Sequence, residues 1–239
     1  HGADPWKPEE KGLFFPLSWV EGIETLIETI VLPKWQESQS PLQKLLDGGG
    51  IVKGNGKTGC SVVVQGGLAP VGAMLAKRNP FTISNLILTS PPTYQDMTTA
   101  APQAELERNY NFLKSPIFGG IAFLILESRE IVRFFSNLFL FQDECDDEWL
   151  DNAENASVRA ARPPIQAFNA GLLQHRSFEE ELKLMSQETV ILSGEGDKRE
   201  ADRAMYASEM KKCELRTMEG LNVVPWENPS GIVELMRGL

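Results

Sequence analysis

The sequence has few cysteines and almost no histidine. Its 239 residues include three cysteines, Cys60, Cys145 and Cys213, and two histidines, His1 and His175. Three widely separated cysteines make neither a disulfide framework nor the paired spacing of a zinc site. We therefore predict no metal and no cofactor, and only two residues remain that could serve as a histidine base.

Basic residues are also in the minority. The chain carries 23 Lys and Arg against 33 Asp and Glu, a formal net charge of −10. Scattered basic residues on an acidic chain exclude the usual footprint of a nucleic-acid-binding protein. No apolar run reaches the roughly 18 to 20 residues that span a bilayer. The longest candidate, Ile117 to Leu126, stops at Glu127, so the sequence predicts a soluble protein without a nucleic-acid partner.

The composition and the pattern of apolar residues suit a single α/β domain over residues 1–239. Residues are 42% hydrophobic, which provides material for one ordinary core. Short apolar runs with strand character alternate with helical patterns, so we predict a parallel sheet covered on both faces. The expected strands are 61–65, 85–90, 189–193 and 213–218.

The remaining segments are assigned from periodicity and from helix breakers. Residues 1–16, rich in proline, are predicted to form an extended arm. Leu17 to Val31 has helical spacing, and Pro33 is expected to end that helix. Residues 54–58 (Gly-Asn-Gly-Lys-Thr) are similar to the end of a phosphate-binding loop, but a strand and not a helix follows, which favours a flexible loop.

The order of these pieces resembles the α/β-hydrolase family, from about Leu17 to the end and most closely after Ser61. Residues 61–77 resemble its strand, nucleophile elbow and helix. Residues 93–185 resemble its helical lid, and residues 190–197 and 221–229 resemble the loops that present its acid and histidine. The lid and the last loop are most similar to hydrolase-like proteins of cyanobacteria and plastids. The resemblance implies a partial α/β-hydrolase-like parallel sheet flanked by helices, with a helical lid insertion.

The catalytic positions of the family are degenerate here. The elbow G-x-S-x-G aligns with residues 65–69 (Gln-Gly-Gly-Leu-Ala), which places Gly67 where the serine nucleophile belongs. Asp197 occupies the acid position, but the histidine position falls on Asn222, which cannot shuttle a proton. His175 lies in the lid region and is interpreted as a solvated helix residue. Because glycine adopts positive φ without steric cost, Gly66 and Gly67 are both expected to do so at the elbow.

The first half of the family's sheet is not recognisable either. The oxyanion loop of the family often lies near a His-Gly pair, and here His1-Gly2 opens the chain. No early strands can be identified around it. A lone four-stranded sheet would leave an edge and apolar surface that something must cover.

These departures predict a catalytically inactive protein that serves as a structural or accessory subunit of a larger assembly. The subfamily resemblance implies a plastid location, with a thylakoid photosystem and its antenna as the specific expectation; otherwise the protein is a soluble intracellular one. The expected partners are protein subunits, with peripheral membrane contact as a further candidate.

Two alternatives stay open at this point. The first is an active esterase or lipase-like enzyme with a displaced nucleophile, for which Cys60, Ser61, Ser90 and Ser193 are the candidates. The second is a small-ligand binder that keeps an apolar pocket for a lipid or a pigment.

The lid is unusually rich in large apolar residues for so small a sheet. Some of them are therefore predicted to face a partner or lipid. The candidates are Ile117, Phe118, Phe123, Phe134, Phe135, Phe139 and Phe141.

Overall fold

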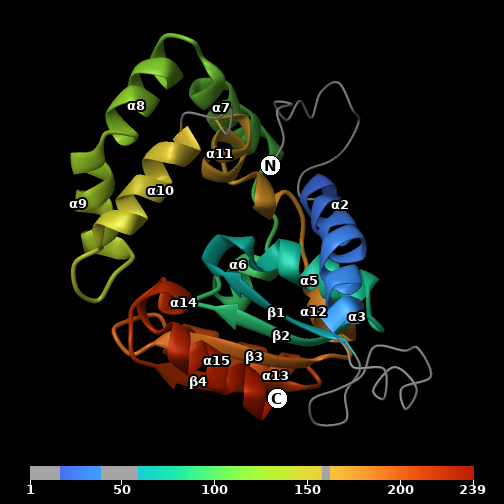
Figure 1. Cartoon of the computed structure of the whole chain (residues 1–239). Helices are drawn as coiled ribbons and strands as arrows, with labels where there is room; N and C mark the ends of the chain where they lie inside the picture. Colours follow the sequence, from blue (N-terminus) through green and yellow to red (C-terminus); the bar gives the residue numbers. More distant parts are fainter. Residues whose placement is uncertain (1–16, 39–58, 158–161) are drawn as a thin grey trace.

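The computed structural model describes residues 17–38, 59–157 and 162–239, and its strands form one parallel sheet in the order β1-β2-β3-β4 (Figure 1). All three strand pairs are parallel, which confirms the predicted architecture, and every strand begins and ends within two residues of its prediction. The predicted arm at 1–16 and the glycine-rich segment 54–58 lie outside the described residues. The strands are β1 Cys60–Gln65, β2 Ile83–Thr89, β3 Glu188–Gly194 and β4 Cys213–Met218.

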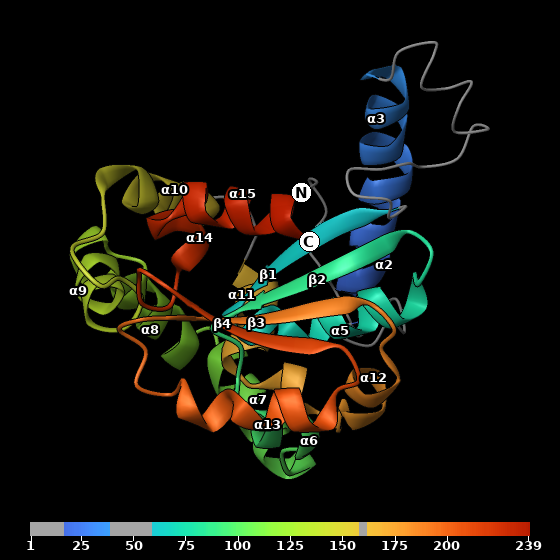
Figure 2. The same cartoon turned by 90° about the horizontal axis from the view of Figure 1, so that it is seen from below.

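Five helices cover one face of the sheet. Leu86, Leu88 and Ile191 point to this side and pack against apolar residues of these helices, among them Val20 and Tyr206. Figure 2 shows α5, α12 and α13 together beneath the sheet. The helices are α2 Leu17–Leu26, α5 Ala69–Arg78, α6 Tyr94–Thr98, α12 Glu179–Leu184 and α13 Ala204–Glu209.

The opposite face is covered by the end of the chain. Ile87, Val190 and Leu192 alternate with the residues of the first face, as a pleated strand requires. They pack against Val224 of α14 (Val224–Glu227) and Ile232 of α15 (Pro229–Gly238). Both faces are therefore buried, which explains why the central strands are continuous apolar runs.

The first helix does not end at Pro33, and that prediction is wrong. A π-helical turn, η1 (Ile27–Val31), follows α2, and α3 (Leu32–Ser38) continues the helix through the proline. The N–H of Leu32 bonds the carbonyl of Ile27, five residues earlier. This wider turn lies just before Pro33, whose ring lacks a donor and would crowd an ordinary α-turn, so the helix passes the proline without stopping.

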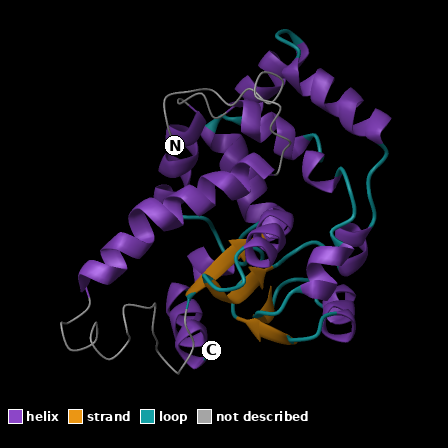
Figure 3. Cartoon of the chain, turned by 90° about the vertical axis from the view of Figure 1, so that its right-hand side faces the viewer, coloured by secondary structure: helices purple, strands orange, loops and turns teal. Residues whose placement is uncertain are grey.

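The described residues between β2 and β3 form helices joined by turns and loops, without a strand. In Figure 1 the middle helices arch away from the sheet, and Figure 3 shows the strands confined to one layer of a largely helical molecule. The predicted lid of 93–185 also includes α6 and α12, which contribute Tyr94, Met97 and Leu182 to the sheet core. The raised part consists of α7 Gln103–Lys114, α8 Phe118–Leu126, α9 Arg129–Phe139, α10 Asp147–Ser157 and α11 Arg162–Asn169.

Candidate functional site

A cavity of about 770 Å³ lies between the lid and the carboxyl ends of β1, β2 and β3. Crevices at this end of a parallel sheet are the usual place for a ligand. Gly67, Asp197 and Asn222 all line it. The structure therefore brings together the three positions that the sequence selected, although they are separated by up to 155 residues.

The elbow itself is intact as a turn. β1 ends at Gln65, a short 3-10 turn covers Gly66–Leu68, and α5 begins at Ala69. Gly66 has φ +58°, a value that favours glycine. Gly67 is not among the positive-φ glycines, so the expectation for that residue is wrong and its lack of a side chain needs another explanation.

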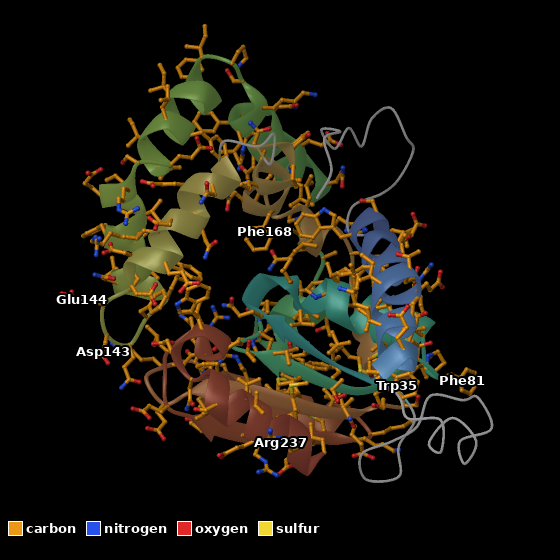
Figure 4. All side chains as sticks on the ribbon, viewed as in Figure 1. Trp35, Phe81, Asp143, Glu144, Phe168 and Arg237 are labelled. Carbon is orange, nitrogen blue, oxygen red and sulfur yellow. The ribbon has the colours of Figure 1, made fainter. Side chains whose placement is uncertain are left out.

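A lid residue fills the place of the missing side chain. A Cβ built on Gly67 would lie 2.7 Å from Cζ and 3.0 Å from Cε2 of Phe168. Phe168 belongs to α11, and Figure 4 shows it between the lid and the sheet. The nucleophile position is thus closed by an aromatic ring. Nothing in the sequence distinguishes Phe168 from the other lid aromatics, and it was not predicted.

We expect Gly67→Ser to destabilise the protein by about 1–3 kcal/mol, because the new side chain overpacks against Phe168. Phe168→Ala in the same chain should recover much of this loss, measured by urea unfolding. Gly22→Ser is the matched control, since a Cβ there meets nothing within 4 Å. Strictly additive effects of Gly67→Ser and Phe168→Ala would contradict the contact.

The acid is held by an arginine. Asp197 is buried, and its carboxylate accepts a hydrogen bond from Arg203 at 2.5 Å and another from the backbone N–H of Arg199 at 2.9 Å. Arg203 is 3% exposed and also donates to Ser193 Oγ and to the carbonyl of Pro91. Asp197 therefore completes a structural network at the end of β3. Arg203 was not predicted, because no motif links it to Asp197.

The histidine position is equally committed to structure. The Asn222 side chain donates to the carbonyl of Phe139, and its backbone N–H donates to the carbonyl of Leu140 at 2.9 Å. Its own carbonyl accepts from Gln65 Nε2 at 2.8 Å. Asn222 thus ties the last loop to the end of α9 and to the elbow. These bonds hold the last loop in the wall of the cavity, which Gln65 and Leu140 also line.

In the part of the chain that the structure describes, none of the candidate displaced nucleophiles has a hydrogen bond to a general base. Ser61 Oγ accepts from Asn85, and Ser193 Oγ accepts from Arg203. Burial raises the pKa of the Cys60 thiol, which is the opposite of what a reactive thiolate needs. Ser90 has the unusual φ of +44°, but its Oγ donates to the carbonyl of Leu221 and not to a base.

The structure also corrects the interpretation of His175. It follows the 3-10 turn η3 (Leu172–Gln174), is half-buried against Phe178, and has its Nδ1 3.1 Å from the carbonyl of Leu172. Burial lowers its pKa. It is therefore not a solvated helix residue. His1 lies outside the described residues, and no described histidine lines the cavity.

The predicted partner-facing residues divide into two groups. Ile117, Phe118, Phe134, Phe135 and Phe139 are exposed. The prediction is wrong for the other two, since Phe123 is 2% and Phe141 is 5% exposed.

Packing explains both exceptions. Phe123 lies four residues after the buried Gly119, on the inner side of α8. Phe141 follows the end of α9 and packs edge-to-face on Trp149 at 5.1 Å. Both residues belong to the interior of the lid and not to its surface.

Two kinds of feature are absent from the described residues, a membrane-spanning helix and a metal-binding cluster. None of their helices combines the length and the apolar character needed to cross a membrane. They also contain no group of three His, Cys, Asp or Glu side chains placed to hold a metal ion.

Comparison with known proteins identifies the fold. No family model and no curated sequence matches the chain. Among solved structures, a mutant of haloalkane dehalogenase DatA from Agrobacterium tumefaciens C58 aligns with a TM-score of 0.52 at 17% identity, over 87% of this chain and 72% of that one. A thermophilic esterase from Thermogutta terrifontis gives 0.51 at 16% identity, over 82% and 67%. The chain therefore has a partial α/β-hydrolase fold.

Proposed function

We propose that this protein is a non-catalytic member of the α/β-hydrolase fold that serves as a structural or accessory subunit of a larger assembly. One observation carries the proposal: every catalytic position of the fold is occupied by a structural contact. Gly67 lies under a lid ring, Asp197 is paired with Arg203, and Asn222 joins the last loop to the lid.

The chemistry of acyl transfer supports the proposal that this arrangement does not hydrolyse esters. A nucleophile must be deprotonated by an adjacent base, and that base must be oriented by an acid. Here the first position has no side chain, the second has an amide, and the acid is neutralised by a buried arginine. Restoring one residue leaves the other two defects in place.

The resemblance of the lid and the last loop to cyanobacterial and plastid proteins supports a specific assembly. We propose a plastid thylakoid complex, with a photosystem and its antenna as the candidate. Co-sedimentation with solubilised thylakoid complexes on a density gradient tests this directly. A protein that stays at the top of the gradient, apart from every complex, would contradict the assignment.

The cavity supports a second candidate function, the binding of a small apolar molecule. Its walls include Trp19, Leu68, Ile165 and Phe168, while Arg199 and Asp96 form an ion pair at 3.1 Å on its polar side. Apolar walls with a few polar groups are typical of ligand pockets. A lipid or a pigment extracted from the purified protein and identified by mass spectrometry would favour this function.

We expect no hydrolysis of p-nitrophenyl acetate above the buffer rate. Gly67→Ser alone and Gly67→Ser with Asn222→His should also remain inactive, because Asp197 stays bound to Arg203. Fluorophosphonate labelling measures nucleophile activation independently, with an active esterase as the positive control. A burst of acyl-enzyme, or labelling of the unmodified protein, would show that a displaced serine is active and would contradict the proposal.

A further inference from the structure

The outer surface of the lid is apolar along two consecutive helices. On α8 the exposed side chains include Phe118, Ile121 and Leu124, and residues 115–126 contain no charge. On α9 the exposed side chains include Phe134, Leu138 and Phe139. We call the exposed apolar side chains of residues 117–139 the α8–α9 surface. These side chains lie on two consecutive helices and are not scattered singly, as apolar residues of an ordinary surface are.

No described residue covers this surface. α8 and α9 lie at the outer margin of the molecule, and α10 lies on their inner side (Figure 1). The contacts to α10 come from the inner side of α9, where Arg129 binds Asp147, Asp151 and Glu154. On the same side Val132 packs in the cluster that holds Leu150 of α10. Leu124 is 71% exposed, so it contributes nothing to the core of this chain.

The apolar surface lies in the most acidic part of the protein. Residues 103–157 contain eleven Asp and Glu against four Lys and Arg, a net charge of −7 out of −10 for the whole chain. Arg129 and Arg133 are both paired with Asp147. Exposed Asp143 and Glu144 lie in the loop between α9 and α10, at the left-hand margin of the molecule (Figure 4). A negative rim therefore borders the apolar residues.

We infer that the α8–α9 surface docks a protein partner that presents an apolar patch bordered by Lys and Arg. The inference rests on the proposed function and names the chemistry of the partner. Complementary charge favours such a partner and steers its approach. The same rim repels a second copy of this chain, and it opposes binding to a bilayer of anionic lipid.

Two model peptides test the charge requirement. The first is an amphipathic helix of leucine and lysine, and the second has glutamate in place of every lysine. We expect the lysine peptide to bind the full chain at least about tenfold more tightly in fluorescence anisotropy, with an affinity that falls as salt is added. Equal affinity for the two peptides would overturn the inference.

Matched variants locate the binding surface. Leu124→Gln with Phe139→Gln should weaken the lysine peptide by about tenfold or more, since exposed aromatic and aliphatic anchors dominate interfaces. Phe81→Gln is the control, because Phe81 is 89% exposed and lies far from the lid (Figure 4). Circular dichroism verifies that each variant is folded. An equal loss in the control would overturn the assignment of the surface.

A second pair of variants separates the rim from net charge. Asp143→Lys with Glu144→Lys should weaken the lysine peptide and flatten its salt dependence. Glu28→Lys with Glu234→Lys makes the same change in net charge on exposed residues of η1 and α15, outside the lid. If both pairs of substitutions weakened the affinity for the lysine peptide equally, net charge alone would explain the effect. That outcome would overturn the assignment of the acidic rim to the binding surface.

Two other outcomes assign the surface to another occupant. Flotation of the protein with phosphatidylcholine vesicles, abolished by Leu124→Gln with Phe139→Gln, would make it a lipid surface and overturn the inference. A dimer in sedimentation equilibrium, lost in the same variant, would assign the surface to a second copy of this chain. That outcome would also overturn the inference. Neither outcome affects the ester assay, so a failure here is distinguishable from a failure of the proposed function.

Discussion

Replacing Arg203 by methionine should cost about 3–5 kcal/mol of unfolding free energy, the usual loss when one partner of a buried ion pair is removed. Methionine keeps most of the side-chain volume, so the loss measures charge and hydrogen bonds. The Asp197 carboxylate would remain buried with only the Arg199 N–H as a donor. The Pro91 carbonyl and Ser193 Oγ would lose their donor as well. Urea unfolding followed by circular dichroism gives the value.

The double variant Asp197→Asn with Arg203→Met is the control. It removes both charges, and it should be more stable than Arg203→Met alone. Arg199→Met removes an exposed guanidinium that pairs with Asp96, and it should change stability by less than about 1 kcal/mol. A single Arg203→Met variant as stable as the original protein would show that Asp197 is not held by this arginine.

Replacing Gly194 by alanine should destabilise the protein by about 4 kcal/mol or more, which is exceptional for a single methyl group. A Cβ at this position would lie 2.1 Å from the carbonyl oxygen of Leu221 and 2.4 Å from that of Gly220. Both obstacles are backbone atoms, so they cannot rotate away. The last loop would have to move from the end of β3, and Asn222 would move with it.

Gly196→Ala is the matched control for this variant. Its Cβ would meet the end of the Leu221 side chain at 3.1 Å, and a side chain can adjust. We expect a loss of roughly 1 kcal/mol or less there. Thermal unfolding of the two variants, side by side, gives the comparison. Equal melting temperatures would mean that the loop after β4 moves at little cost and does not hold Asn222 in place.

Local patterns were sufficient for the sheet and for the positions around the cavity. The central strands β2 and β3 are buried and contain continuous apolar runs, so their positions follow from composition. The exposed edge strand β4 alternates apolar and polar residues instead. Asp197 and Asn222 lie on turns directly after β3 and β4, and the ends of parallel strands meet at one edge. That geometry places them together with Gly67 without any knowledge of side-chain contacts.

What the sequence did not reveal depends on packing between distant segments. Phe168 meets Gly67 only because α11 folds back over the elbow, and Arg203 reaches Asp197 only through the turns after β3. The exposure of lid residues depends on which side of each helix finds a neighbour. Phe141 shows this, since apolar character alone did not distinguish a buried ring from the exposed Phe139.

The lid insertion also determines how the sheet can assemble over time. A 3-10 turn and one α-helix join β1 to β2, and the same is true of β3 and β4, whereas 98 residues separate Thr89 from Glu188. Pairing of β2 with β3 must close this long loop, a non-local step that slows folding. Its entropic cost grows only with the logarithm of loop length, by about 0.6 kcal/mol for each doubling. The length of the lid therefore affects the folding rate far more than the equilibrium stability. We expect β1 to pair with β2, and β3 with β4, before β2 pairs with β3.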